Sequence, residues 1–257
     1  MKVSLSPNFK YLLFVGSGRT GSTLVGQILN CHPNILITNE SRILQHCINT
    51  DTQLISHVPK LIDIAHHEFL NGTHQYDKPE KQQHKNKWQR DWKNTAQLSL
   101  PEKSTIKFIG DKKQGGNTKL ITHSEDKVRN ALSKINFVPI TVMRNPEQVF
   151  KSYLRLNNDL TVSRKTVFND MLTGYSFCKE NNGIIIRYET LLNDPAGWCK
   201  KISKSLELEY NEGWKEVVCN TVNSSKKELV LNDEEIEYFR SHSDYHKLNK
   251  AINDTDI

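Results

Sequence analysis

Short apolar runs alternate with amphipathic stretches along most of this chain. Apolar runs at 11–15, 34–38, 107–110, 137–143 and 183–188 predict strands. Helical patterns follow at 23–30, 145–156, 198–206 and 234–240. Because strands that alternate with helices pack as a parallel sheet with helices on its faces, the sequence predicts an α/β fold. We expect a three-layer sandwich with a central parallel sheet.

The pattern changes between about residues 66 and 105. His, Gln, Asn, Lys and Asp dominate this segment, and Trp88 and Trp92 are its main aromatic residues. We expect a polar insertion that is either a flap over a site or a solvated surface excursion. Residues 1–257 are otherwise predicted to form a single domain, since a chain of this length can bury one full core.

The composition narrows the class of protein. A net charge of +6 favours an anionic ligand, although lysines scattered over the surface give the same total. No apolar run approaches the ~18 residues of a membrane span, so we expect a soluble, cytoplasmic protein. We expect no nucleic acid among its partners. The 5 cysteines include no CxxC pair, which favours reduced thiols over a metal site.

The chemistry of the chain centres on a glycine-rich stretch at 14–24, where an apolar run ends and an amphipathic segment begins. Gly16, Gly18 and Gly21 match a dinucleotide fingerprint, and Glu40 stands about where its ribose-binding acid is expected. A nicotinamide-dependent Rossmann oxidoreductase is therefore one interpretation. A nucleoside triphosphate loop fits poorly, because Ser22 replaces the obligatory lysine.

A phosphosulfate-binding loop is the third interpretation. Arg19 lies inside the turn, and Thr20, Ser22 and Thr23 add hydroxyl donors beside the backbone amides. A dinucleotide loop depends on close backbone approach, whereas a sulfuryl group in transfer needs several donors matched to its charge. The residue chemistry favours this third interpretation.

A second basic position supports it. Arg144 follows the strand predicted at 137–143, and Ser152 lies two turns into the helix after it. Both side chains can reach a phosphate above the carboxyl edge of the sheet. A surface ion pair is the other interpretation of Arg144 taken alone.

These motifs resemble those of sulfotransferases that use 3′-phosphoadenosine 5′-phosphosulfate (PAPS). The segment from Gly18 to Leu24 is similar to their 5′-phosphosulfate motif, and Arg144 with Ser152 is similar to their 3′-phosphate motif. A later segment that contains Tyr188 resembles the family's Tyr-Glu-x-Leu stretch. The resemblance covers about residues 10 to 206. It implies a P-loop-like three-layer sandwich and a reaction that needs no metal.

The stretch from Cys31 to Arg42 resembles most closely the tyrosylprotein sulfotransferase branch. The resemblance implies that Glu40 is the general base and that Arg42 contacts the substrate or orients the base. Lys112 resembles the family's catalytic lysine, with Lys113 as the neighbouring candidate. Tyr188 either contacts the nucleotide or packs beneath it, and residues 224–227 are candidate late contributors to the 3′-phosphate site.

The implied reaction moves a sulfuryl group from PAPS to an acceptor hydroxyl and releases adenosine 3′,5′-bisphosphate (PAP). Arg19, Lys112 and the loop amides would stabilise the transferred group. The acceptor is a glycan, a protein tyrosine or a small metabolite, and the sequence does not separate these classes or indicate an oligomeric state. The rival oxidoreductase interpretation gives no role to Arg19 or to the pair of Arg144 and Ser152.

Overall fold

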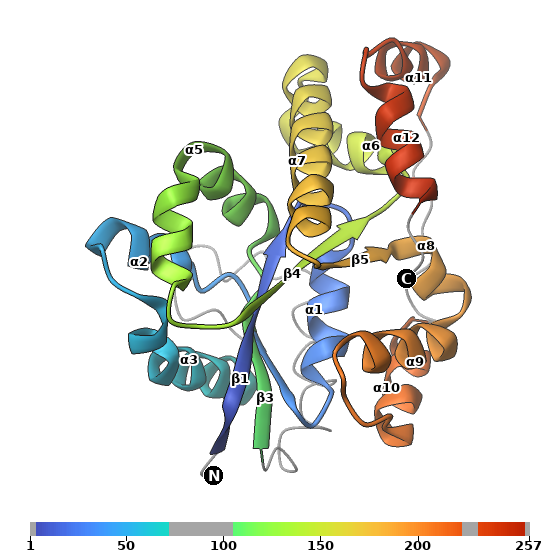
Figure 1. Ribbon diagram of the computed structural model, residues 1–257. Helices are drawn as coiled ribbons and strands as arrows, with labels where there is room; N and C mark the ends of the chain where they lie inside the picture. Colours follow the sequence, from blue (N-terminus) through green and yellow to red (C-terminus); the bar gives the residue numbers. More distant parts are fainter. Residues whose placement is uncertain (1–3, 72–104, 223–230, 255–257) are drawn as a thin grey trace.

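The computed structural model describes residues 4–71, 105–222 and 231–254. Strands and helices alternate along these ranges (Figure 1). The strands are β1 (Ser4–Val15), β2 (Ile35–Thr38), β3 (Thr105–Asp111), β4 (Phe137–Met143) and β5 (Ile184–Arg187). The helices are α1 (Ser22–Asn30), α2 (Ile43–Thr50), the 3-10 helix η1 (Leu54–His57), α3 (Val58–Asn71), α5 (Gln114–Leu132), α6 (Pro146–Asn157), α7 (Leu160–Glu180), α8 (Tyr188–Asn193), α9 (Pro195–Ser205), α10 (Glu212–Val222), α11 (Asp233–Arg240) and α12 (Tyr245–Asn253).

The strands form a 5-stranded sheet in the order β2-β3-β1-β4-β5, and each neighbouring pair is parallel. The chain places β2 and β3 on one side of β1 and then crosses to place β4 and β5 on the other. Ligands of open parallel sheets bind beyond the carboxyl ends of the strands at such a reversal. The prediction of an α/β sandwich around a parallel sheet is confirmed.

The central strand β1 is buried on both faces. Leu12 and Phe14 belong to the core shared with α1, α9 and α10, while Tyr11, Leu13 and Val15 belong to the core shared with α2, α3 and α5. All five side chains are 0% exposed. A strand covered on both faces has a continuous apolar run in place of alternation. This burial explains the unbroken hydrophobic pattern at 11–15.

A third apolar cluster joins α11 and α12 to α6 and α7. Helices α7 and α12 lie beside one another in Figure 1. Phe239 of α11 stacks on Phe150 of α6 and Phe168 of α7, with ring centroids 4.7 and 4.9 Å apart. Glu235 of α11 also accepts hydrogen bonds from Lys151 of α6 at 2.8 and 2.6 Å. The C-terminal helices therefore brace the helix that carries Ser152.

The predicted elements differ from the observed ones mainly at their ends. β1 begins at Ser4, well before the predicted strand, and β5 ends at Arg187, so Tyr188 begins α8. The predicted insertion at 66–105 begins inside α3 and otherwise lies outside the described residues. In the described part of the chain, no helix is both long and apolar enough to cross a membrane.

Candidate functional site

The glycine-rich loop between β1 and α1 requires glycine at two positions. Gly16 has φ of 107° and Gly21 has φ of 95°, a backbone conformation that residues with a Cβ rarely adopt. A Cβ on Gly16 would collide with Thr141 Oγ1, and one on Gly21 would overlap the Tyr188 ring. The Gly16 amide donates to Thr118 Oγ1 at 2.6 Å, which ties the start of the loop to α5. Packing from three elements therefore sets the path of the loop.

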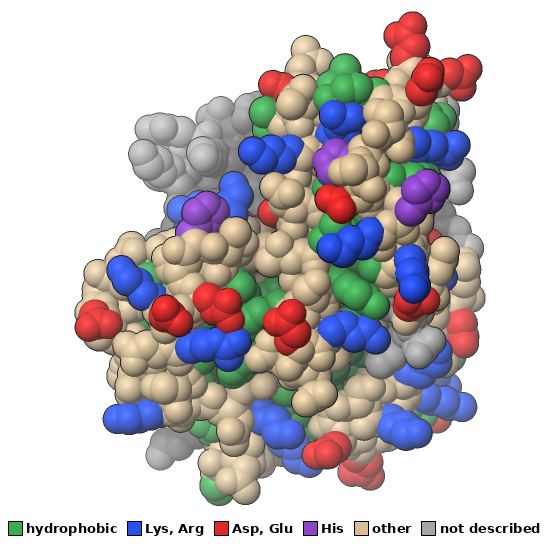
Figure 2. All heavy atoms as spheres, turned by 45° about the horizontal axis from the view of Figure 1, so that its top comes forward, with side chains coloured by type: hydrophobic (Ala, Val, Ile, Leu, Met, Phe, Trp, Pro, Cys, Tyr) green, Lys and Arg blue, Asp and Glu red, His purple; other side chains and the backbone are tan. Residues whose placement is uncertain are grey.

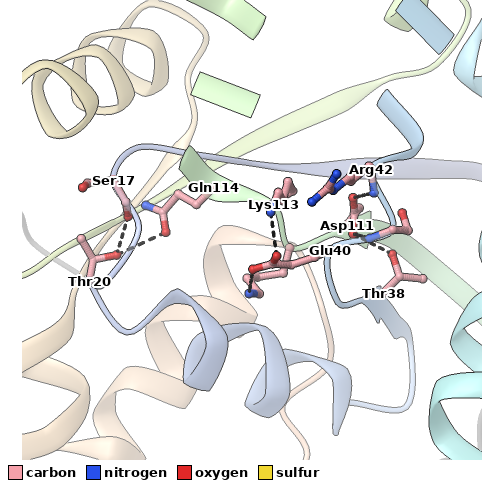
Figure 3. A network of polar contacts seen from close by, with 10 residues as sticks. Ser17, Thr20, Thr38, Glu40, Arg42, Asp111, Lys113 and Gln114 are labelled. Carbon is pink, nitrogen blue, oxygen red and sulfur yellow. Dashed lines mark hydrogen bonds and ion pairs between the residues drawn. The ribbon is translucent and has the colours of Figure 1, made fainter. Parts of the chain in front are cut away.

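The inner side of the loop is held by hydrogen bonds (Figure 3). The Thr20 hydroxyl lies 3.1 Å from the Ser17 carbonyl oxygen and 3.2 Å from Gln114 Oε1 of α5. Thr20 and Ser17 are both fully buried. The hydroxyl of Thr20 thus shapes the loop from within.

The outer side of the loop presents the start of α1. Gly21 is the N-cap of this helix, so no side chain caps it, and its first turn contains no acidic residue. Uncapped amides and the helix dipole favour an anion at such an end. The hydroxyls of Ser22 and Thr23 belong to the same turn. This end of α1 fits a phosphate or sulfate group.

The carboxyl ends of β2 and β3 bring Glu40 against two lysines, a trio that we call the base cluster (Figure 3). Glu40 Oε1 lies 2.9 Å from Lys112 Nζ, and Oε2 lies 2.6 Å from Lys113 Nζ. The Lys112 side chain is 5% exposed and packs on Gly26 of α1, whereas that of Lys113 is 26% exposed. Both candidate lysines therefore contact the candidate base.

The charges of the base cluster determine how Glu40 titrates. Burial works to raise the pKa of its carboxyl, but the ion pairs with Lys112 and Lys113 prevail and lower this pKa to about 2. Such a carboxylate stays ionised at neutral pH, and its low basicity makes proton transfer to it unfavourable.

A second group, which we call the arginine cluster, includes a residue of the loop and comprises Arg19, Arg144, Ser152 and Tyr188. Arg19 Nε donates to Ser152 Oγ at 2.9 Å, and Arg144 Nη1 lies 3.5 Å from the Arg19 carbonyl oxygen. The Arg144 guanidinium carbon is 4.9 Å from the centroid of the Tyr188 ring, in a cation–π contact. These four residues come from segments far apart in the sequence.

The start of α6 explains where Ser152 lies. Asn145 caps this helix, and its side chain accepts from the amides of Glu147 and Gln148. Pro146 occupies the first turn, where its missing N–H costs no hydrogen bond. The helix therefore begins directly after β4, and Ser152 follows two turns later beside Arg19.

Most of the expected site residues thus fall into two groups, each joined by its own contacts. Arg42 lies beside the base cluster, where its backbone amide donates to Asp111 at 3.0 Å (Figure 3). Gly18 packs against Tyr153, whose hydroxyl would be 2.8 Å from a Cβ at that position. Residues 224–227, Trp88 and Trp92 lie outside the described residues.

Three residues of this region were not predicted from the sequence. Asp111 contacts the turn that carries Glu40, Gln114 contacts Thr20, and Tyr153 lies 3.4 Å from the Ser17 hydroxyl. Asp111 and Tyr153 are sequence neighbours of the predicted Lys112 and Ser152, which is the only signal the sequence offers. Gln114 has no distinguishing pattern around it.

The fold and these contacts define an α/β protein with basic side chains and an uncapped helix start at the carboxyl edge of a parallel sheet. The chain belongs to the sulfotransferase family, because the family model described as "Sulfotransferase family" matches residues 12–212. This finding confirms the resemblance at the level of the family. A search among curated proteins found no match.

Several solved structures of sulfotransferases are similar to this chain, and one of them reaches a TM-score of 0.50. The sulfotransferase domain of the Synechococcus PCC 7002 olefin synthase has 16% identity and a TM-score of 0.50, over 100% of this chain and 97% of that one. The sulfotransferase STF9 from Mycobacterium avium has 11% identity and a TM-score of 0.47, over 98% of this chain and 79% of that one. A sulfotransferase from Alicyclobacillus acidocaldarius has 11% identity and a TM-score of 0.47, over 98% of each chain.

Proposed function

We propose that this protein transfers the sulfuryl group of PAPS to an acceptor hydroxyl, with Glu40 as the general base. The base cluster is the observation that carries the proposal. It joins Glu40 to Lys112 and Lys113 through two ion pairs at the edge of the sheet where the loop also lies. A carboxylate that can take a proton beside cations that can accept sulfuryl oxygens suits transfer to a hydroxyl.

The donor is held at both ends by residues that suit its charges. The amides of residues 18–22 and the hydroxyls of Ser22 and Thr23 would bind the 5′-phosphosulfate at the uncapped start of α1. Arg144 and Ser152 would bind the 3′-phosphate, and Arg19 lies between the two sites. Tyr188 packs beneath the loop and supports Arg144, as the contact with its ring suggests. PAPS supplies an activated sulfuryl group and a stable leaving group.

The lysines of the base cluster connect donor binding to proton transfer. The sulfuryl oxygens attract Lys112 and Lys113 away from Glu40, which raises the pKa of its carboxyl from about 2 and makes it a better base. Glu40 then takes the proton of the acceptor hydroxyl. The acceptor oxygen forms a bond to sulfur as the bond from sulfur to the bridging oxygen breaks, and PAP leaves with the electron pair. Lys112 and Arg19 stabilise the charge on the leaving phosphate.

The spacing of Glu40 and Arg42 favours the tyrosylprotein sulfotransferase-like branch of the family. Arg42 is placed in the same turn as Glu40 and is proposed to contact the acceptor or orient the base. Glycans, protein tyrosines and small hydroxylated metabolites are the acceptor classes that this chemistry allows. All of them carry a hydroxyl that needs a base near neutral pH.

A thermal-shift comparison of PAP with NAD(H) tests the donor. Saturating PAP should raise the unfolding temperature, since a ligand at ~100 times its Kd stabilises a fold by about 2.7 kcal/mol. Stabilisation by NAD(H) alone would instead favour the oxidoreductase interpretation. Incubation with PAPS labelled in its sulfur and fractionated cell extracts should then label one acceptor class, and a Glu40→Gln variant serves as the blank.

A further inference from the structure

Asp111 is a buried carboxylate to which neither the family motifs nor the proposed reaction gives a role. It ends β3, is 1% exposed, and accepts three hydrogen bonds from the last residue of β2 and the segment after it (Figure 3). The donors are the Thr38 hydroxyl at 3.0 Å, the Ser41 amide at 2.8 Å and the Arg42 amide at 3.0 Å. Both carboxylate oxygens are used, so the side chain is fixed at several points.

The segment that Asp111 holds has an unfavourable backbone. Glu40 has φ of 62° and Arg42 has φ of 57°, in the left-handed region that residues with a Cβ seldom occupy. Such a conformation persists only where its surroundings hold it in place. The two amides that donate to Asp111 belong to Arg42 itself and to Ser41, which lies between the two left-handed residues. The hydrogen bonds therefore act directly on this turn.

Asp111 also fixes the backbone directly before α2. The N-cap position of this helix is Arg42, which forms no capping hydrogen bond through its side chain. The amides of Ser41 and Arg42 that donate to Asp111 precede the first helical residue, Ile43. The carboxylate therefore holds the residues that lead into the helix, whereas an ordinary cap accepts from amides of the first turn.

The chain leaves Asp111 directly into the two lysines that bind Glu40. The Lys112 amide donates to the Thr38 carbonyl oxygen at 2.8 Å, which aligns the ends of β2 and β3. Side chains and backbone thus form a closed ring. Asp111 holds the backbone next to Glu40, and Glu40 binds the side chains that follow Asp111.

We propose that Asp111 is a positioning residue for sulfuryl transfer, which fixes the turn of Glu40 and Arg42 relative to Lys112. The inference rests on the proposed function of Glu40. Asp111 does not reach the acceptor, because it is buried under the turn. Its effect should therefore fall on the rate of transfer and spare the affinity for the nucleotide.

The test is an Asp111→Asn variant assayed by single-turnover transfer from labelled PAPS. Asparagine keeps one acceptor oxygen but turns an NH2 group toward a backbone N–H. We expect the transfer rate to fall ~10–100-fold, the scale on which a misplaced catalytic group loses rate. The Kd of PAP should stay within about threefold of the wild-type value, because the substitution leaves the proposed nucleotide-binding residues unchanged. An unchanged rate, or parallel losses of rate and PAP affinity, would overturn the proposal.

Asp159→Asn is the matched control. Asp159 caps α7 by accepting from the Val162 amide at 2.8 Å, and asparagine caps helices as well as aspartate does. The same chemical change at this helix start should leave the transfer rate within about twofold. If Asp111→Asn does not fold, Thr38→Val removes one of the three hydrogen bonds. We then expect a smaller loss of rate with unchanged PAP affinity, and an unchanged rate would count against the proposal.

A double-mutant cycle separates positioning from other effects. If Asp111 acts through Glu40, adding Asp111→Asn to Glu40→Gln should cause little further loss of transfer. Losses that multiply would refute the assigned role. Full transfer by Glu40→Gln alone would overturn the proposed function, whereas a slow Glu40→Gln and a fast Asp111→Asn would overturn only this inference.

Discussion

The base cluster and the arginine cluster both place two cations beside the glycine-rich loop, yet their partners differ. Lys112 and Lys113 are paired with a carboxylate at 2.9 and 2.6 Å. Arg19 and Arg144 contact a hydroxyl, a carbonyl oxygen and an aromatic ring, all of which are neutral. One carboxylate offsets one of the two positive charges in the first cluster, whereas the second keeps both of its positive charges.

This difference indicates that the two clusters have different roles in ligand binding and transfer. A cation with neutral partners can bind an incoming phosphate without giving up an ion pair. A cation paired with a carboxylate has to exchange one anion for another, which couples ligand binding to the state of that carboxylate. We therefore expect the arginine cluster to govern nucleotide affinity and the base cluster to govern the rate.

The charge of the surface does not distinguish the base cluster from the arginine cluster. The chain has a net charge of +6, but Figure 2 shows Lys and Arg side chains interspersed with Asp and Glu over the face it presents. The net charge therefore says nothing about the site. The two clusters differ in the local partners of their cations.

The substitution Glu40→Gln should have the largest effect on this comparison. Loss of a general base lowers transfer by ~10²–10⁴-fold. The affinity for PAP should be retained or increased, because Lys112 and Lys113 lose their carboxylate partner. Single-turnover transfer from labelled PAPS and calorimetric titration with PAP measure the two quantities.

Glu125→Gln is the matched control for Glu40→Gln. Glu125 is also a glutamate in an ion pair, with Arg129 at 2.6 Å, but the pair is exposed on α5. Its removal should change neither the rate nor the affinity, since exposed pairs contribute little. Wild-type transfer by Glu40→Gln would show that another group takes the proton.

The Arg144→Ala substitution should act on the other cluster. Loss of a charged hydrogen-bond donor to phosphate weakens binding by ~10–100-fold, from the 1.5–3 kcal/mol of such bonds. The loss should appear for PAP and be small for AMP, which lacks the 3′-phosphate. Titration of both nucleotides measures this difference, and Arg129→Ala is the control at an exposed arginine. Equal losses for PAP and AMP would place Arg144 away from the 3′-phosphate.

The sequence predicted most of the sheet because its strands are buried on both faces. The runs at 11–15 and 137–143 contain little polar alternation, so they stand out without any partner. Several helices were not predicted, among them α2, α5, α7, α10 and α12. α5 has a non-helical residue, Ser124, inside it, and α7 has buried residues on several sides that face both the sheet and α12. Their sequences therefore lack one clean apolar stripe.

The candidate site residues were named from the sequence and their roles stay predictions, whereas their mutual contacts could not be predicted. Resemblance to a family supplied Glu40 and Lys112, whereas their ion pair depends on β2 and β3 being neighbours. The proposed role of Asp111 had no local signal, because the residues that it holds are about 70 positions away in the sequence. Its hydrogen bonds with Ser41 and Arg42 depend on β2 and β3 being neighbours, which only the tertiary structure reveals.

The smallest predicted effect concerns Asp170, a carboxylate of α7 that lies behind the loop on the side of Gly115. It is 8% exposed, and burial raises its pKa to about 6, against the charge of Lys119. Glu40 shows the opposite shift because two lysines contact it directly. The contrast shows that burial raises the pKa of a carboxyl here unless close cations offset it.

The sign of this shift determines how Asp170 affects stability. Its pKa is higher in the folded protein than in the unfolded chain, so its contribution is fully present below pH ~4 and is lost as the pH rises through about 6. Above pH 6 the buried carboxylate is ionised and destabilises the fold by at most about 3 kcal/mol, at about 1.4 kcal/mol per pKa unit. Asp170→Asn removes that charge but still buries a polar group. We expect it to stabilise the protein by about 1 kcal/mol at pH 8.

Denaturant unfolding of the wild type, of Asp170→Asn and of Glu40→Gln from about pH 2 to pH 8 measures these effects. The gain should grow between pH 4 and 6 and then level off, since only the ionised form of Asp170 is unfavourable. Glu40→Gln should behave in the opposite way, because the lowered pKa of Glu40 stabilises the fold above pH ~4.5 and this contribution fades as the pH falls toward about 2. A gain for Asp170→Asn that does not depend on pH would mean that packing, and not charge, separates the two carboxylates.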